Sequence, residues 1–287
     1  EGCRRTWERP VQNTSGEIVA LGDEVLPGVP PGERQATPDT GHAQLPAVRC
    51  TGADRLPAAE IGIIVGSDAS LAELLDHPED VTIETPYGQP SDCILVGEIA
   101  GRRVALLHRH GRERMLPPHR IPYRANLWAM HSLGVTRLIA HTAVGSLQPE
   151  VRVGDLVLCS QFVDRTRGRA DTYHTGPKIV HACMAEPYCP ELRSLAAVVG
   201  KQMDLRVHPE GTVVVIQGPR LSTHAESRWF RQMGWHVINM TQYPECVLAR
   251  ELGMCYLNIS LVTDCDAGLI GEPGLPSTVD DMLAEIS

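Results

Sequence analysis

The chain contains the stretch Cys255-Tyr-Leu-Asn-Ile-Ser-Leu-Val262, which runs directly into Thr263-Asp-Cys-Asp266. The first part of this stretch is near-continuously apolar, as is typical of a central strand that is buried in a sheet. Two carboxylates then follow within four residues, so the end of the strand gathers polar side chains. The stretch therefore predicts a buried strand with a candidate functional site at its carboxyl end.

Other apolar runs indicate further strands, and helical patterns fall between them. Thr223 with Glu226 three positions later is a capping-box pattern at the start of one such helix. The predicted strands are 61–65, 93–97, 103–107, 137–140, 155–158, 212–216 and 255–262, and the predicted helices are 122–133, 190–203, 222–233 and 244–252. This alternation predicts a three-layer α/β domain with a central, largely parallel or mixed β-sheet flanked by helices.

Residues 1–58 differ in composition from the rest of the chain. They hold seven Pro and seven Gly, and Trp7 is their single aromatic residue. No apolar period runs through them, and they lack the basic, apolar and small-residue order of a signal peptide. We therefore expect residues 1–58 to be a disordered N-terminal extension, and residues 59–287 to form the folded domain.

Composition and charge exclude several classes of function. Lys and Arg total 26 against 35 Asp and Glu, a formal charge of −9, whereas a general nucleic-acid binder is usually basic. No apolar run approaches the roughly 20 residues that a membrane span needs. The nine cysteines form no CxxC pair, and several lie in apolar runs. We therefore expect reduced, buried thiols in a cytoplasmic protein that binds neither a nucleic-acid polymer nor a membrane.

Polar residues follow five of the strand ends, where α/β sheets bind their ligands. Hydroxyls, a guanidinium, an imidazole and turn amides together suit an oxyanion pocket, although Ser and Thr at single strand ends are more often simple turn formers. No Walker A loop and no GxGxxG occurs, so the fingerprints of nucleoside triphosphate and dinucleotide sites are missing. The five segments are Gly66-Ser67, His108-Arg-His-Gly111, His141-Thr-Ala-Val-Gly-Ser146, Asn239-Met-Thr241 and Thr263-Asp-Cys-Asp266.

Asp264 and Asp266 are the sharpest chemical feature of the sequence. Two residues apart on an extended strand, their side chains point the same way. Repulsion between like charges, together with partial burial, then raises one of the two pKa values. A carboxylic acid that stays protonated near neutral pH can act as a general acid toward a leaving heterocycle. The alternative is that both carboxylates are hydrated in a loop or cap a turn.

Three histidines, His108, His110 and His119, allow a metal site to be considered. His108 and His110 share one face of a strand, but no carboxylate nearby in sequence completes a ligand set. We therefore expect no metal, and we expect His110 to contact an anion. Met240 would ordinarily be core filler.

The chain resembles the trimeric purine nucleoside phosphorylases and, within them, the S-methyl-5'-thioadenosine phosphorylases. The matching motifs occur in the family's order from about residue 61 to residue 266. They are Ile61-Gly-Ile-Ile, Thr85-Pro-Tyr-Gly-Gln-Pro-Ser-Asp92, Arg109-His-Gly-Arg112, Tyr123-Arg-Ala-Asn-Leu-Trp-Ala129, Thr142-Ala-Val-Gly-Ser-Leu147, Gly154-Asp-Leu-Val157, Gln161-Phe-Val-Asp-Arg-Thr166, Met184-Ala-Glu-Pro-Tyr-Cys-Pro190, Gln217-Gly-Pro-Arg-Leu-Ser222, Ile238-Asn-Met-Thr241, Pro244-Glu245 and Thr263-Asp-Cys-Asp266.

The resemblance implies reversible phosphorolysis of S-methyl-5'-thioadenosine to adenine and 5-methylthioribose 1-phosphate, by a homotrimer that uses no cofactor beyond inorganic phosphate as co-substrate. It also implies a role for each matched position. Asp264 is the implied proton donor to the base, and Asp266 accepts from the 6-amino group. The implied phosphate ligands are Ser67, Arg109, His110, Thr142, Ala143 and Thr241. The other implied substrate contacts are Met240 at the ribose, His181 near the 5' substituent, and Ser222 and Val279 at positions that shape specificity.

Two departures from the family pattern keep other functions open. Asp68 adjoins the expected phosphate loop, and the chain ends about 20 residues after Asp266, so we expect the family's long C-terminal helix to be truncated. A weakly active nucleoside-binding fragment is therefore one alternative. A second is a purine nucleoside phosphorylase of broader or 6-oxopurine specificity. A third is a metal hydrolase built on His108 and His110.

Overall fold

The structure is a computed structural model. It describes residues 57–66, 70–113, 115–177 and 179–269, together with the two-residue strands β1 (Val11–Gln12), β2 (Ile18–Val19) and β3 (Arg49–Cys50). The predicted N-terminal extension lies almost wholly outside these residues, and so does the end of the chain, where we expect the C-terminal helix to be truncated. The division of the chain at residue 58 therefore stays a prediction.

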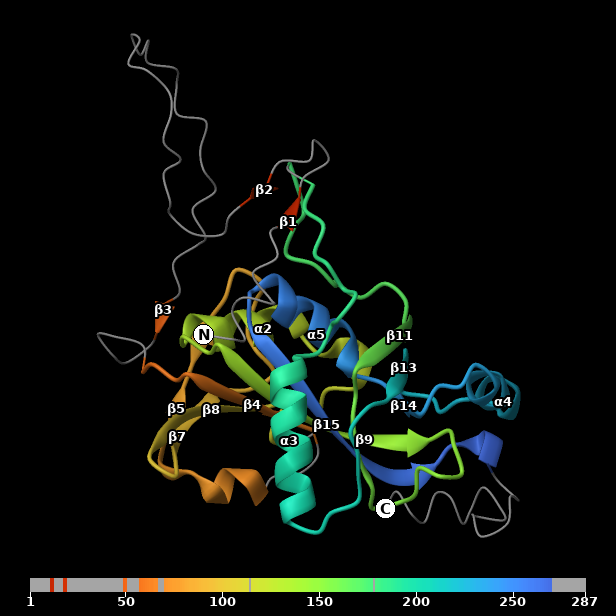
Figure 1. Cartoon of the computed structure of the whole chain (residues 1–287). Helices are drawn as coiled ribbons and strands as arrows, with labels where there is room; N and C mark the ends of the chain where they lie inside the picture. The colour runs from red at the N-terminus through yellow and green to blue at the C-terminus, as the bar shows by residue number, and fades with distance from the viewer. Residues whose placement is uncertain are drawn as a thin grey trace.

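A central mixed β-sheet dominates the fold (Figure 1). Its strands run in the order β11-β13-β14-β9-β4-β8-β7-β5, and β15 pairs with both β9 and β10, which in turn pairs with β12. The eleven strands are β4 (Ile61–Val65), β5 (Asp76–Val81), β7 (Ile94–Ile99), β8 (Arg102–His108), β9 (Arg137–Ser146), β10 (Leu156–Leu158), β11 (Gln161–Arg165), β12 (Val207–His208), β13 (Thr212–Ile216), β14 (Val237–Asn239) and β15 (Cys255–Cys265). Both parallel and antiparallel pairs occur, as in β4 with β8 and β7 with β8, which confirms the predicted mixed sheet.

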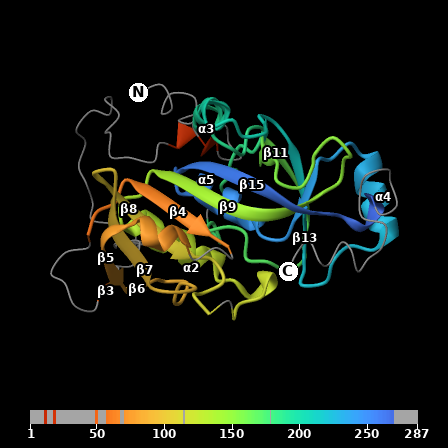
Figure 2. The ribbon, with the colours of Figure 1, turned by 90° about the horizontal axis from the view of Figure 1, so that it is seen from below.

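Within the described residues, four α-helices accompany the sheet: α2 (Tyr123–Ser132), α3 (Pro190–Gln202), α4 (His224–Gln232) and α5 (Gln242–Glu251). In Figure 2, α2 and α5 lie on the same side of the sheet, behind β4, β9 and β15. α3 packs against β10, β12 and β15, and α4 packs against the short 3-10 helix Ala267–Leu269 that follows β15. The capping box of α4 is present as predicted, with Thr223 and Glu226 bonded reciprocally.

Strand β9 creates a break in the sheet. One edge of β9 pairs with β15 along its whole length, whereas the other edge pairs with two different strands. β4 runs parallel to residues 137–140, and β14 runs antiparallel to residues 145–146. These two strands therefore run toward each other along one edge of β9 and end before they meet. Residues 141–144 of β9 face the break, and the carboxyl ends of β4 and β14 both point into it.

Strand β15 is longer than predicted and carries an irregularity. We expected it to end at Val262, but its pairing with β9 continues to Cys265. The register shifts between Val262 and Asp264, so Thr263 is an extra residue in the ladder. Such a bulge re-aims the side chains that follow it, and β15 then ends at Cys265, so Asp266 lies outside the strand for which a regular alternation with Asp264 was assumed.

The sequence patterns missed β5, β11 and the two-residue strand β12. β5 contains Pro78 and three acidic residues, and all but its last residue are exposed. An edge strand of this kind has no apolar alternation to reveal it. Within the described parts of the chain, no helix is long and apolar enough to cross a membrane. No disulfide links the cysteines there, and four of them are buried, namely Cys159, Cys189, Cys246 and Cys265.

Candidate functional site

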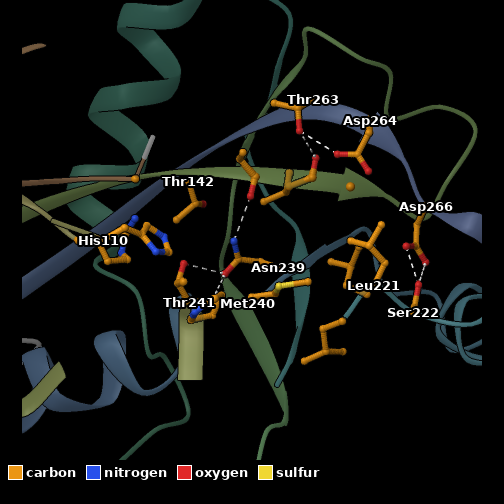
Figure 3. A pocket seen from close by; sticks show the side chains of 18 residues that line it. His110, Thr142, Leu221, Ser222, Asn239, Met240, Thr241, Thr263, Asp264 and Asp266 are labelled. Atoms are coloured by element: carbon orange, nitrogen blue, oxygen red, sulfur yellow. Dashed lines mark hydrogen bonds between the residues drawn. The ribbon is translucent and has the colours of Figure 1, made fainter. Parts of the chain in front are cut away.

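A pocket of about 260 Å³ lies at the break in the sheet. Figure 3 shows His110, Thr142 and Thr241 at one end of it, Asp264, Asp266 and Ser222 at the other, and Met240 between them. The lining residues come from seven segments of the chain, and all of these segments except the one at Pro118 follow or belong to a strand. They are Gly66, Arg109, His110, Pro118, Thr142, Ala143, Val144, Gly145, Ile216, Leu221, Ser222, Ile238, Asn239, Met240, Thr241, Thr263, Asp264 and Asp266.

Arg109 reaches the pocket from the end of β8 as a fully buried ion pair. Its Nε and Nη2 donate to the two carboxylate oxygens of Glu245, at 2.7 and 3.0 Å, and Nη1 donates to the carbonyl of His141 at 3.0 Å. Arg109 is 1% and Glu245 0% exposed. Burial alone would lower the pKa of Arg109, but the charge and hydrogen bonds of Glu245 raise it above its usual value. The guanidinium therefore stays charged and cannot rotate freely.

Two more of the expected anion ligands have restricted orientations. The Nδ1 of His110 lies 2.7 Å from the carbonyl of Leu116, and because a carbonyl only accepts, Nδ1 carries the proton. The Nε2 of His110 can then donate to an anion only as part of an imidazolium. The hydroxyl of Thr142 is 3.0 Å from the Oδ1 of Asn258 and points toward the interior. We expected this hydroxyl to bind an oxyanion directly, and the structure directs it elsewhere.

The backbone of β9 supplies a donor in its place. The carbonyl of Ala143 accepts from the side-chain amide of Asn239 at 3.1 Å, so it points into the break in the sheet. The N–H and the C=O of one strand residue point to the same side. The N–H of Ala143 therefore also faces the pocket. This end of the pocket therefore presents the backbone N–H of Ala143 and not the hydroxyl of Thr142.

The two carboxylates at the opposite end differ in their partners. Asp264 accepts from the hydroxyl of Thr263 at 2.8 Å, and its carboxylate fills space that a side chain at position 145 would occupy. A Cβ on Gly145 would lie 3.0 Å from an Asp264 oxygen. Asp266 accepts from the hydroxyl of Ser222, which lies 2.6 and 2.7 Å from its two oxygens.

The pKa expectation for the carboxylate pair needs a correction. The pKa of Asp266 is raised, and burial is the first cause, partly offset by hydrogen bonds such as that from Ser222. The negative charge of Glu226 adds to the increase. Asp264 still belongs to β15, whereas Asp266 follows the strand and directly precedes the 3-10 helix, so the two carboxylates have different surroundings and burial is the larger effect on Asp266.

Apolar groups line the middle of the pocket. Met240 is part of the wall rather than of the core, and it packs over Gly218, where an added Cβ would lie 2.5 Å from the sulfur of Met240. Gly218 also has a φ of +60°, a conformation that favours glycine. Leu221, Ile216 and Ile238 complete this part of the wall.

Three of the expected site residues are not among those that line the pocket. For Ser67 and Val279 the expectation stays untested, because both lie outside the described residues. His181 is exposed, in the segment between β11 and α3, and does not line the pocket of its own chain. In the part of the chain that the structure describes, no group of three or more His, Cys, Asp or Glu side chains could hold a metal ion.

Sequence reasoning missed three residues that shape the site: Glu245, Asn239 and Gly145. Glu245 stood in the matched motif Pro244-Glu245, but its role gave no signal because it meets Arg109 from 136 positions away in the chain. Asn239 stands next to the recognised Met240 and Thr241, and its place at a strand end was a usable signal. Gly145 would have required knowledge of the neighbouring strand.

The chain matches known proteins over most of its length. The family model described as Phosphorylase superfamily matches residues 60–286. The S-methyl-5'-thioadenosine phosphorylase of Pyrococcus horikoshii is 53% identical over 207 residues, which cover 72% of this chain and 79% of that protein. The purine nucleoside phosphorylase of Streptomyces coelicolor is 50% identical over 218 residues, which cover 73% of this chain and 77% of that protein.

Solved structures show the same relationship. A methylthioadenosine phosphorylase from an Antarctic soil metagenomic library superposes with a TM-score of 0.72 at 39% identity, over 79% of this chain and 81% of that one. A variant adenosine/methylthioadenosine phosphorylase from Schistosoma mansoni, solved with methylthioadenosine, gives a TM-score of 0.72 at 34% identity, over 79% and 85%. The chain therefore belongs to the phosphorylase superfamily, in the group that includes the S-methyl-5'-thioadenosine phosphorylases, and is a pentosyltransferase.

Proposed function

We propose that this protein catalyses the reversible phosphorolysis of S-methyl-5'-thioadenosine to adenine and 5-methylthioribose 1-phosphate. One observation carries the proposal: a single pocket has cationic and backbone N–H groups at one end, an apolar middle, and two carboxylates at the other. A nucleoside with its phosphate has the complementary order of anion, sugar and basic heterocycle. The relatives at about 50% identity that are named for this reaction support the same assignment.

The proposed mechanism uses the two ends of the pocket together. Phosphate, held by Arg109, His110 and the amide of Ala143, attacks C1' while the bond from C1' to N9 of the purine breaks. The phosphate charge stabilises the positive charge that develops on the sugar. The electron pair of the broken bond moves into the purine, and a proton from Asp264 reaches N7. Adenine then leaves as a neutral molecule.

We assign Asp264 as the proton donor and Asp266 as the acceptor from the 6-amino group. The hydroxyl of Ser222 donates to Asp266, and a carboxylate that accepts hydrogen bonds is suited to meet an amino group. Gly145 leaves the Asp264 carboxyl group open to the pocket. Because burial raises the pKa of Asp266, that residue is the rival donor, and comparing Asp264→Asn with Asp266→Asn decides between them.

The remaining expectations stay proposals. We propose further phosphate ligands at Ser67 and Thr241, and substrate contacts from Met240, His181, Ser222 and Val279. Thr142 was also expected to bind phosphate, but its hydroxyl contacts Asn258 and its backbone groups alternate with those of Ala143, toward β15. We also propose that the protein uses no cofactor and works as a cytoplasmic homotrimer. Its partners would be the nucleoside and phosphate, not a nucleic-acid polymer or a membrane. Sedimentation at micromolar protein concentration tests the trimer.

A second candidate function is a purine nucleoside phosphorylase of broader specificity. The relative from Streptomyces coelicolor that carries this name is 50% identical, which is close to the identity of the methylthioadenosine phosphorylases. The two functions differ at the base, because a 6-oxopurine offers an acceptor where adenine offers a donor. An ionised carboxylate only accepts hydrogen bonds, so Asp266 matches the 6-amino group of adenine better than the oxygen of a 6-oxopurine.

One experiment tests these proposals. Adenine release from methylthioadenosine is measured with and without phosphate, and hypoxanthine release from inosine is measured in parallel. Release of adenine that requires phosphate, with little release from inosine, is the expected result. Comparable release from inosine would favour the second candidate function. Release that does not need phosphate would indicate a hydrolase and overturn the proposal.

A further inference from the structure

Asn239 lies where β14 ends and α5 is about to begin, and it lines the pocket. It follows Ile238, the last residue of β14 that pairs with β9. Its side chain is 7% exposed, so both polar atoms need partners inside the protein. None of the roles derived above assigns it a function.

The side-chain amide of Asn239 joins β9 to the start of α5. Nδ2 donates to the carbonyl of Ala143 at 3.1 Å. Oδ1 accepts from the backbone N–H of Thr241 at 2.6 Å, from the N–H of Gln242 at 2.8 Å, and from the hydroxyl of Thr241 at 3.3 Å. These partners fix the orientation of the amide, because a carbonyl only accepts and an N–H only donates. An aspartate could keep the contacts of Oδ1 but not the one made by Nδ2.

The contact with Ala143 matters for an anion in the pocket. A carbonyl oxygen that faces the break carries partial negative charge and repels an anion, unless a donor occupies it. Two carbonyls of β9 face the break, and each is occupied: that of His141 by Arg109, and that of Ala143 by Asn239. The edge of the strand then presents a donor, the N–H of Ala143, to an anion.

We propose that Asn239 is a positioning residue for phosphate: it neutralises the Ala143 carbonyl and holds Thr241 so that the edge of β9 and the start of α5 together accept an anion. The proposal rests on the proposed function, because phosphate is the anion in question. Asn239 acts through Ala143 and Thr241. Its effect should therefore fall on phosphate and not on the nucleoside, whose base we place at the far end of the pocket, beside the Asp264 and Asp266 side chains that Figure 3 shows there.

The test compares Asn239→Asp with the wild-type protein. The aspartate keeps an acceptor for Thr241 and Gln242, but it places a negative charge against the Ala143 carbonyl. We expect the KM and the Kd for inorganic phosphate to rise at least about tenfold, because the buried Ala143 carbonyl loses its donor and the aspartate repels phosphate. The KM for methylthioadenosine at saturating phosphate should change less than about threefold. Thermal unfolding without phosphate checks that the variant folds.

Asn239→Ser is the second variant if the aspartate does not fold. A short hydroxyl can accept from the N–H of Thr241 but is too short to reach Ala143. The same selective rise for phosphate is expected. Equal changes for phosphate and nucleoside, or no change for phosphate in a folded variant, would overturn the proposal. Absence of phosphate-dependent adenine release from the wild-type protein would instead refute the proposed function, so the two failures are distinguishable.

Discussion

The buried ion pair between Arg109 and Glu245 makes a prediction that joins stability to phosphate binding. In Glu245→Gln, Arg109 keeps a neutral hydrogen-bond partner but loses the charge that balances it. Both side chains are excluded from water, with exposed fractions of 1% and 0%. Breaking a buried ion pair costs about 3–5 kcal/mol of stability. Because the glutamine keeps one hydrogen-bond acceptor for Arg109, we expect the free energy of unfolding to fall by about 3 kcal/mol. For a domain of this size that lowers the Tm by about 6–12 °C.

Phosphate should recover much of this loss. The uncompensated charge of Arg109 attracts a phosphate oxygen about 4 Å away by about 4 kcal/mol at an effective dielectric of 20. A poorly oriented guanidinium loses about 1 kcal/mol per hydrogen bond. The electrostatic attraction between Arg109 and phosphate therefore exceeds the hydrogen-bond energy that is lost when the guanidinium is poorly oriented. The Tm of the variant should rise more with added phosphate than the Tm of the wild-type protein does.

The assay is thermal unfolding across a phosphate titration at constant ionic strength. Glu79→Gln is the matched control, because Glu79 pairs with Arg103 at 3.1 Å while both side chains remain well exposed, at 55% and 40%. An exposed pair contributes about 0.2–1 kcal/mol. The reasoning is refuted if the two variants lose the same stability, or if phosphate stabilises Glu245→Gln less than it stabilises the wild-type protein.

Three further predictions concern the base end, the interior and the pH dependence. Gly145→Ala places a methyl group 3.0 Å from an Asp264 oxygen, so we expect adenine affinity to fall about tenfold while phosphate affinity holds, as isothermal titration can measure. Thr142→Val should lower the free energy of unfolding, measured in urea, by about 1–2 kcal/mol. The KM for phosphate should change less than about threefold, because the Thr142 hydroxyl points into the interior, and a large increase in this KM would contradict that orientation. Burial would raise the pKa of Asp155, but hydrogen bonds from the Arg152 N–H and from His208 outweigh it and lower that pKa. The stability that Asp155 contributes is therefore present above its unfolded pKa of about 3.9 and is lost as the pH falls through its lower folded value. Asp155→Asn should be less stable than the wild-type protein at pH 7 and similar to it near pH 2. A difference in unfolding free energy that persists near pH 2 would contradict the lowered pKa of Asp155.

Much of the fold is readable from local pattern. The buried strands β4, β13 and β15 are apolar runs, and the capping residues Thr223 and Glu226 mark the start of α4. These features depend on residues a few positions apart, so no distant contact is needed to find them. Edge strand β5 escaped because its exposed acidic residues carry no apolar period.

The residue types of the site were also in the sequence, but their roles were not. Arg109, Asp264 and Asp266 stand after strands in recognisable motifs, which was enough to predict that they share a pocket. The bulge at Thr263, the inward hydroxyl of Thr142 and the partner of Arg109 depend on neighbouring strands and helices brought together by folding. Burial and hydrogen bonding set the charge state and direction of a polar group. Local sequence therefore determined which groups are available, and only the tertiary structure decided which face the pocket, because that depends on contacts between residues more than a hundred positions apart.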